Sequence, residues 1–583
     1  MHQKPSKPHR SDALAGAAIL TLSALVVKLM GLLYRIPMLD RLGTEGMGYF
    51  NTALELYALL CALSTAGLPV AMSVLISDTR HRDMPLTARR LGVRRIFSVA
   101  LVTFMVVGCV GSVLLALFAR PLAALLGNPA AASAMVAIAP TVLLICLSSA
   151  MRGYFQGKGN MIPTAISQVV ESAGKLAFGL LLASRARARG ADLPGVAAAA
   201  VLGLTIGTLL SLGYLALHKA LEGRRAPAAP ARLTADGLLA GENCAIETAC
   251  SLENTNCAAA ACPSRRAVFR ALMRTALPVT MGAALLSLCR VADLAIILRR
   301  LAALGVDSVR ANQLYGAYST LALPLFHLLP TLATSVSVSS IPALAAALAD
   351  SQTPQNSDED HEKHSPRQIA TRALGVTIYL AVPAALGLST LSREVLSLLF
   401  PAQPVAVAEA APLLSLLALS VPAACLVTVT GGMLQAAGHP AAPIRALLIS
   451  TALRLPLLGL LLGVTAGTAV PLLAVPLTTL LGDTVMAALQ LRALACHAPA
   501  LLPTPRQAVS LFGIPLVASV LSLCVASFGR SLLLARYPHM PAPAVTVLFV
   551  LTVVLLYAAC LLFLQAVRGR RKSLSAQMGL DKI

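Results

Sequence analysis

The sequence predicts an all-α polytopic membrane protein with about 14 transmembrane helices. Hydrophobic residues make up 57% of the 583 residues, charged residues make up only 12%, and the mean hydropathy is +0.79. An ordinary soluble domain carries about 25% charged residues. Apolar runs of about 20 residues, the length that crosses a bilayer, recur along the whole chain.

The first apolar run, Ala13–Leu33, is longer than the apolar segment of a signal peptide, which has about 7–15 residues. It also contains Lys28, so we expect it to be retained as the first helix. The expected helices lie near residues 12–34, 47–77, 92–118, 130–151, 161–184, 193–217, 268–298, 312–348, 368–391, 406–432, 441–464, 468–491, 507–529 and 542–566.

The long polar segment in the middle of the chain predicts two six-helix lobes. We expect an N-lobe at residues 1–218 and a C-lobe at residues 268–495, joined by a cytoplasmic linker at residues 219–267. Residues 496–583 are expected to add two further helices and a basic C-terminal tail. Matching halves around a long loop are typical of carriers that work by alternating access.

Basic residues in the connections predict the orientation. With the N-terminus inside the cell, about 30 of the 46 Lys and Arg residues fall in the termini and cytoplasmic connections, and about 12 fall in outer ones. The positive-inside rule therefore favours a multi-pass protein of the cell (plasma) membrane with both termini cytoplasmic. Arg185, Arg187, Arg189, Arg299 and Arg300 go against this assignment.

The net charge of +22 does not indicate nucleic-acid binding, because basic loops beside anionic lipid head groups explain it. Membrane lipids are therefore expected partners, and nucleic acid is not. The chain contains no G-x-x-x-x-G-K-[ST] loop, no H-E-x-x-H motif and no G-x-S-x-G motif. We therefore expect a carrier that is not an enzyme and uses no cofactor.

Four cysteines lie in the long linker, at Cys244, Cys250, Cys257 and Cys262. A zinc site and a simple linker are the alternatives. The spacing lacks the tight C-x2-C pair of common zinc sites, so we expect a linker without metal.

Charged side chains inside the expected helices are the candidate functional residues. A charge near the middle of a bilayer costs at least about 2.5–3.5 kcal/mol, so such residues usually face a polar cavity or an opposite charge. The set comprises Lys28, Arg35, Glu55, Glu171, Lys175, Arg290, Asp293 and Arg454. Basic members outnumber acidic ones, which suits an anionic head group, because Arg and Lys bind phosphate oxygens.

Spacing gives four of these residues a local partner. Glu171 and Lys175 lie four residues apart, and Arg290 and Asp293 lie three apart, so each pair shares one face of its helix. Mutual neutralisation and a ligand role are open alternatives for both pairs.

The other four charges have no obvious local partner, which favours a cavity-lining role over snorkelling to the membrane surface. They are Lys28, Arg35, Glu55 and Arg454. The preference for a cavity-lining role is weakest for Arg35, which lies near the predicted outer end of the first helix.

Several stretches in both halves of the chain carry a family resemblance. The first reads KLMGLLYRIP from Lys28, LGTEGMGYF from Leu42 and STAGLPVAMS from Ser64. The later ones are Leu277–Leu301, Leu314–Pro342 and Leu434–Leu461. Together they resemble the polysaccharide-transporter branch of the MATE/MOP superfamily, and within it the stage V sporulation protein B-like proteins, relatives of the MurJ-type lipid II flippases.

The resemblance implies an N-lobe and a C-lobe around a central cavity, with a lipid-tail groove formed by the last two helices. It also implies a lipid-linked oligosaccharide, carried on polyprenyl pyrophosphate, as the substrate. Lys28 and Arg35 match the basic-Gly-aromatic-Arg pattern of the family's first helix. Arg290 departs from the family, where an uncharged polar residue is more usual at this point.

Three functions are therefore open at this stage. The favoured one is a flippase that moves a cell-wall precursor to the outer leaflet, in vegetative growth or sporulation. The alternative is a cation-coupled multidrug exporter of the MATE type, for which the basic excess is unsuitable. A non-transporting scaffold would not need charges inside its helices. Coupling to H+ or Na+ through Glu55 or Glu171 and drive by the membrane potential are both open.

Overall fold

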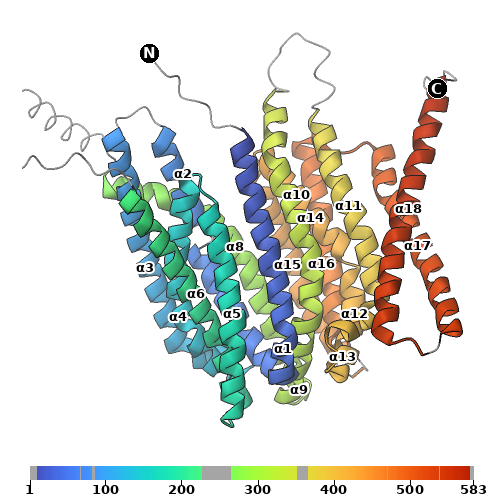
Figure 1. Cartoon of the computed structure of the whole chain (residues 1–583), viewed down its shortest axis with the longest axis horizontal. Helices are drawn as coiled ribbons and strands as arrows, with labels where there is room; N and C mark the ends of the chain where they lie inside the picture. Colours follow the sequence, from blue (N-terminus) through green and yellow to red (C-terminus); the bar gives the residue numbers. More distant parts are fainter. Residues whose placement is uncertain are drawn as a thin grey trace, which may run out of the picture. The chain divides into compact units, whose positions relative to one another are not determined.

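The computed structural model describes residues 10–65, 67–81, 86–225, 264–350, 365–465, 467–468, 470–537 and 539–577. Every regular element in these ranges is a helix (Figure 1). This confirms the predicted all-α fold class. A chain within hydrocarbon must satisfy its backbone hydrogen bonds internally, and a continuous helix does so.

Contacts divide the chain into two compact units, Met1–Ala295 and Ile296–Ile583. The first unit contains α1 (Arg10–Thr65), α2 (Leu68–His81), α3 (Leu86–Leu125), α4 (Ala132–Gly157), α5 (Ile162–Ala188), α6 (Leu193–Arg225) and most of α8 (Arg265–Ala303). The second contains the end of α8 followed by α9 (Ser308–Ala317), α10 (Leu323–Asp350), α11 (Pro366–Thr390), α12 (Ser392–Leu399), α13 (Pro404–Ala418), α14 (Val421–Ala436), α15 (Ala441–Thr465), α16 (Ala474–His497), α17 (Pro505–Arg536) and α18 (Ala542–Gln577).

The number of membrane-length helices differs from the expected fourteen. Within the described residues, twelve are long and apolar enough to cross a membrane, or thirteen if α13 and α14, bent by 48° at their junction, form one span. One of the twelve is the 59-residue run Leu22–Arg80. The sequence predicts two helices there, and the backbone of α1 is indeed broken at Gly43, whose φ of 64° and ψ of −178° are not helical.

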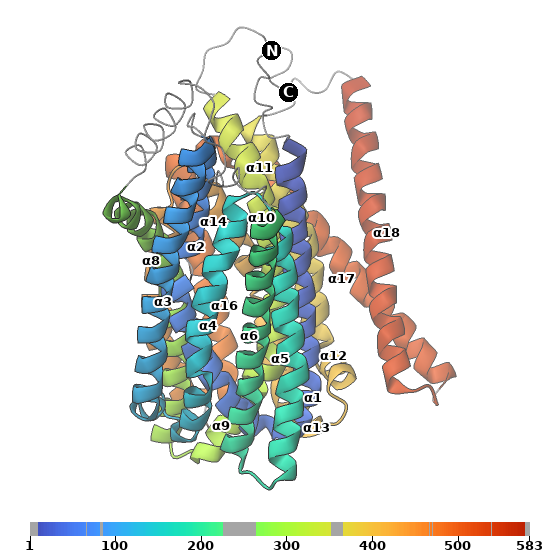
Figure 2. The same cartoon turned by 60° about the vertical axis from the view of Figure 1, so that its left-hand side comes forward.

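In the first unit, α1 and α5 run side by side in the same direction (Figure 2). Ser23 Oγ donates to Gln168 Oε1 at 3.3 Å, and further along both helices Arg41 Nε donates to Ser184 Oγ at 2.6 Å. The sequence offset between the paired residues is 145 at the first contact and 143 at the second, so the helices run parallel with nearly the same register.

The first unit also holds two very close helix crossings. A methyl group added at Gly203 of α6 would lie 2.2 Å from the Cα of Gly179 in α5. Farther along the same pair, a methyl at Gly174 would lie 2.6 Å from the Cα of Gly207. Glycine therefore lets the backbones of α5 and α6 touch, as small residues do between membrane helices.

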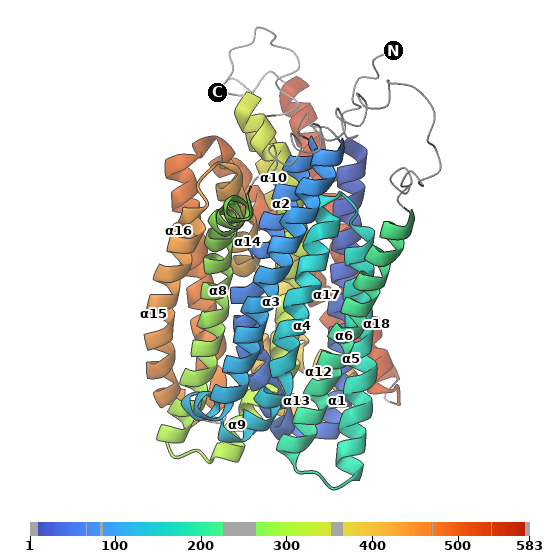
Figure 3. The ribbon, with the colours of Figure 1, turned by 90° about the vertical axis from the view of Figure 1, so that its left-hand side faces the viewer.

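The division between the units falls within α8. Val268, Leu272 and Ala276 of its first half are buried with residues of α2, α3 and α4, helices that lie together in Figure 3. The first helix of the expected C-lobe thus belongs largely to the first unit. The lobe boundaries expected from the sequence stay a prediction.

In the second unit, α17 and α18 pack on each other, and α17 packs on α11. Leu391, Ala526 and Phe549 form a buried cluster there. Arg530 of α17 forms an ion pair with Glu394 of α12 at 3.0 Å. The last two expected helices are therefore present and attached to this unit.

Candidate functional site

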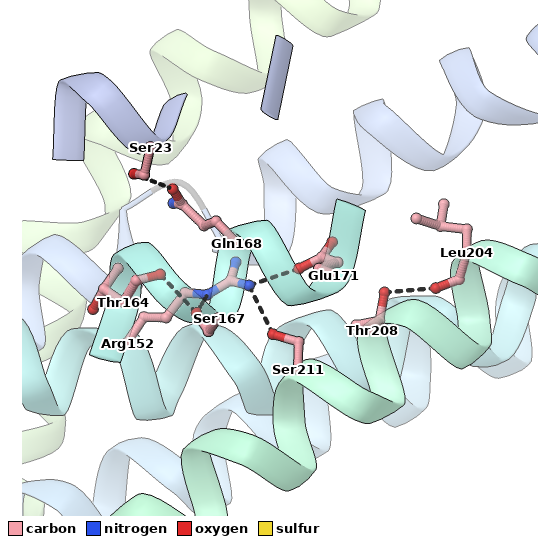
Figure 4. A network of polar contacts seen from close by, with 9 residues as sticks. All are labelled: Ser23, Arg152, Thr164, Ser167, Gln168, Glu171, Leu204, Thr208 and Ser211. Carbon is pink, nitrogen blue, oxygen red and sulfur yellow. Dashed lines mark hydrogen bonds and ion pairs between the residues drawn. The ribbon is translucent and has the colours of Figure 1, made fainter. Parts of the chain in front are cut away.

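Arg152 of α4 is the centre of a polar network in the first unit (Figure 4). Its Nη2 lies 2.6 Å from Glu171 Oε2 in α5 and donates to Ser211 Oγ of α6 at 3.1 Å. Its Nε donates to Ser167 Oγ at 3.0 Å. Both charged side chains are largely buried, with 13% and 17% of their surface exposed. The network therefore ties three helices together and neutralises Glu171.

Glu171 thus has a different ion partner from the one its spacing suggested. Lys175 lies instead over two aromatic rings, with its Nζ 5.3 Å from the centre of Tyr34 and 5.9 Å from that of Phe50. The faces of aromatic rings attract cations, so this arrangement stabilises an ammonium group away from bulk water. Tyr34 and Phe50 come from the two arms of α1, which both face α5 at this level.

A second ion pair links α1 with α8 and is much looser. Arg290 Nε lies 3.8 Å from Glu55 Oε2, and Arg290 Nη2 donates to Ser287 Oγ at 3.2 Å. Arg290 leaves 42% of its side chain exposed. Glu55 Oε2 is buried without a hydrogen-bond partner in the described part of the chain. Arg290 is therefore paired with Glu55, a residue that the sequence left without a partner.

The remaining first-unit candidates share this electrostatic neighbourhood. The charges of Arg290, Arg35 and Asp293 all act on the Glu55 carboxylate. Arg35 also acts on Lys175, and both Arg290 and Arg35 act on Lys28, whose side chain is exposed. The structure therefore brings seven of the eight predicted residues into one unit, with Arg152 added to them.

Arg454 lies in the second unit, on α15. Its side chain packs on α16 at Gly482, where a methyl group would lie 2.6 Å from Arg454 Cδ. The charge of Arg454 acts on Asp483, the next residue of α16. Asp483 is a second residue that the sequence reasoning missed.

One signal in the sequence points to Asp483. Arg454 lies eleven residues before the end of α15 and Asp483 lies nine residues after the start of α16, whereas Arg152 and Glu171 lie five before the end of α4 and nine after the start of α5. Residues placed symmetrically about a short helical hairpin lie at the same depth on adjacent helices.

No group of three or more His, Cys, Asp or Glu side chains that could hold a metal ion occurs in the described ranges. Cys244, Cys250, Cys257 and Cys262 lie outside those ranges, so the linker expectation stays a prediction.

Comparison with known proteins agrees with this architecture. The family model described as polysaccharide biosynthesis protein matches residues 13–348, and the MatE model matches residues 360–459. Stage V sporulation protein B of Bacillus subtilis (strain 168) is 27% identical over 341 residues, which cover 58% of this chain and 58% of that protein. Lipid II flippase MurJ of the same organism is 30% identical over 173 residues, covering 29% and 32%. These matches span well under two thirds of the relatives' lengths.

Solved structures extend the likeness over nearly the whole chain. The inward closed conformation of lipid II flippase MurJ has a TM-score of 0.62 at 13% identity, covering 93% of this chain and 98% of that one. An inward-facing multidrug resistance MATE transporter of the MOP superfamily has a TM-score of 0.56 at 15% identity, covering 84% and 98%. At such identities the likeness concerns the fold. The resemblance predicted from the sequence is confirmed: the chain belongs to the polysaccharide biosynthesis protein family and has the multi-pass membrane fold of the MOP superfamily.

Proposed function

We propose that this protein is a flippase for a lipid-linked oligosaccharide, a polyprenyl-pyrophosphate-linked cell-wall precursor of the lipid II type, that works by alternating access. The charge balance of the first unit carries the proposal. Among the candidate residues of this unit, with Arg152 added, five are basic and three are acidic: Lys28, Arg35, Arg152, Lys175 and Arg290 against Glu55, Glu171 and Asp293. The relatives named for lipid II transport and sporulation support the same substrate class.

The residues differ in their availability to a pyrophosphate. Arg152 is enclosed by its partners, so its charge serves the helix bundle. Lys28 and Arg290 are exposed. We therefore assign head-group binding to Lys28, Arg35 and Arg290, with Lys175 as a further cation behind them. Arg454 is the corresponding candidate in the second unit.

The membrane potential is a sufficient driving force for export. Moving a head group with two negative charges out of a cell with a negative interior gains roughly 2.3 kcal/mol per charge per 100 mV, or about 4–5 kcal/mol in all. Uptake of H+ or Na+ at Glu55 would add to this gain. The proposal includes a plasma-membrane location, cytoplasmic termini and a cytoplasmic linker, in accordance with the positive-inside rule.

Substitutions at Lys28 test the proposal. A charge-assisted contact contributes about 1.5–3 kcal/mol, so Lys28→Met should weaken precursor binding roughly tenfold to a hundredfold. Lys28→Arg keeps the charge and should retain most of the activity. The measurement is precursor translocation in liposomes at matched protein levels, with Arg454→Ala as a test of the second unit. Full activity in both Lys28→Met and Arg454→Ala would contradict the proposal.

A cation-coupled multidrug exporter is the second candidate, because MATE transporters share the fold. Such a protein would keep its activity without Lys28 and lose it without Glu55. Transport of a cationic dye by Lys28→Met, together with loss in Glu55→Gln, would favour the exporter.

A further inference from the structure

A cluster of lysines and aromatic rings lies at one end of the first unit, and none of its members is assigned to transport. It consists of Phe97 in α3, Tyr154 near the end of α4, Lys158 directly after α4, and Lys219 in α6. We call it the lysine–aromatic cluster. Helix α4 packs against both α3 and α6, so the cluster spans three adjacent helices (Figure 2).

The two ammonium groups of the cluster converge on one ring. Lys158 Nζ lies 4.4 Å and Lys219 Nζ 4.8 Å from the centre of Tyr154. Lys219 Nζ is also 2.9 Å from the centre of Phe97, and the two rings meet edge to face at 5.0 Å. The rings therefore hold two like charges close together, against their mutual repulsion.

Only part of this charge is neutralised within the described residues. Lys158 Nζ donates to Glu222 Oε1 at 2.9 Å, whereas Lys219 Nζ donates to no acceptor there. Arg80 of α2 adds a third cation, because its guanidinium donates to the carbonyl oxygen of Lys158. The charge of Glu222 also acts on Lys219. Since Lys219 donates no hydrogen bond within the described residues, it keeps all three of its N–H donors for an external acceptor.

The same end of the unit has a strong basic excess. Arg90 and Arg94 of α3 lie seven and three residues before Phe97, on the same face of the helix. Among the described side chains of α2, α3, α6 and the residue directly after α4, seven basic residues meet two acidic ones at this end. They are Arg80, Arg89, Arg90, Arg94, Arg95, Lys158 and Lys219, against Asp78 and Glu222.

We infer that the lysine–aromatic cluster binds the phosphate group of an anionic membrane lipid. Lysine is a common phosphate ligand, and a phosphate between Lys158 and Lys219 would relieve the repulsion of their charges. Tyrosine at the ends of membrane helices is typical of the head-group level, and basic pockets between such helices bind anionic head groups. Under the proposed orientation this end faces the inner leaflet.

The test measures lipid retention, which does not require transport and is independent of the proposed function. Purified full-length protein is titrated with phosphatidylglycerol, and bound lipid is counted by native mass spectrometry. Phosphatidylcholine serves as the lipid without net charge, and inorganic phosphate as the free anion. The test variant is Lys158→Gln/Lys219→Gln. The control is Arg120→Gln/Arg189→Gln, which removes the same charge from exposed sites at the other end of the helices.

The cluster variant should bind phosphatidylglycerol about tenfold more weakly, while the control stays within about twofold of the natural protein. Phosphatidylcholine binding should change in neither variant. Equal loss in both variants, or no loss in the cluster variant, would overturn the inference. Displacement of the lipid by millimolar inorganic phosphate would also overturn it, since the ligand would then be a free anion. If the double variant does not fold, Lys219→Gln alone gives the same comparison.

Discussion

Two regions of the first unit hold buried charge in opposite ways. Between α4, α5 and α6, the guanidinium of Arg152 meets Glu171 at 2.6 Å and two serine hydroxyls besides. Between α1 and α8, Arg290 and Glu55 are 3.8 Å apart, and a buried oxygen of Glu55 has no hydrogen bond in the described residues. In the first region the guanidinium of Arg152 has hydrogen-bond partners from two neighbouring helices. In the second, a carboxylate oxygen of Glu55 is available to accept a hydrogen bond from a ligand. The comparison teaches that an intramembrane charge must be judged by whether its neighbours satisfy it, and not by its position in the sequence alone.

Removal of Arg152 should have the largest effect on stability. Arg152→Ala leaves Glu171 buried without its counter-charge, and breaking a buried pair in this way costs about 3–5 kcal/mol. We expect a correspondingly lower free energy of unfolding, measured by denaturant titration in detergent. Arg152→Gln/Glu171→Gln removes both charges and should recover much of the loss. If Arg152→Ala has the same free energy of unfolding as the natural protein, the ion pair of Arg152 and Glu171 does not stabilise the packing of α4, α5 and α6.

The glycine crossing of α5 and α6 should give the next largest effect. In Gly203→Ala the new methyl would lie 2.2 Å from a backbone atom of Gly179, so the helices must separate. Overpacking of this kind costs typically about 1–3 kcal/mol. The control is Gly213→Ala on the same helix, where a methyl meets nothing within 4 Å. Gly203→Ala should have a lower melting temperature than Gly213→Ala in thermal unfolding. Equal melting temperatures would show that α5 and α6 can move apart at this crossing without loss of stability.

The loose pair of α1 and α8 should have the smallest effect on stability and a clear one on transport. Arg290 is 42% exposed, so Arg290→Gln should change the free energy of unfolding by less than about 1 kcal/mol. Precursor translocation should nevertheless fall, because a cation assigned to the head group is lost. Glu55→Gln removes the other charge of this pair and should likewise have a small effect on the free energy of unfolding. A large loss of stability in either variant, without a transport defect, would show that the Arg290–Glu55 pair has a structural role like that of Arg152 and Glu171.

Most of the fold could be predicted from hydropathy, because a membrane imposes length and apolarity on each helix separately. The exceptions are local. The break at Gly43 falls in the gap between the first two expected helices, whereas the bend between α13 and α14 lies inside a single expected helix, 406–432.

The sequence supplied a list of candidate residues, but not their ion partners. Spacing along one helix suggested Lys175 for Glu171, but the ion partner is Arg152, which lies one residue beyond the expected helix 130–151. Pairing between helices depends on their relative rotation, and one sequence contains little of that information. The near-symmetry of Arg454 and Asp483 about their hairpin is the part that a sequence does contain.

The contact between α2 and α8 has a mechanical consequence. Pro278 lies inside α8, where it removes a backbone hydrogen bond and crowds the preceding turn. Gly67, just before α2, approaches α8 on both sides of this point, since a methyl there would lie 2.1 Å from the carbonyl oxygen of Ala276 and 2.5 Å from Thr280 Oγ1. A helix bends most readily at a proline, so we expect α8 to bend where the backbone before α2 closely approaches it. One proline and one glycine thus set where the helix that contributes to both units bends.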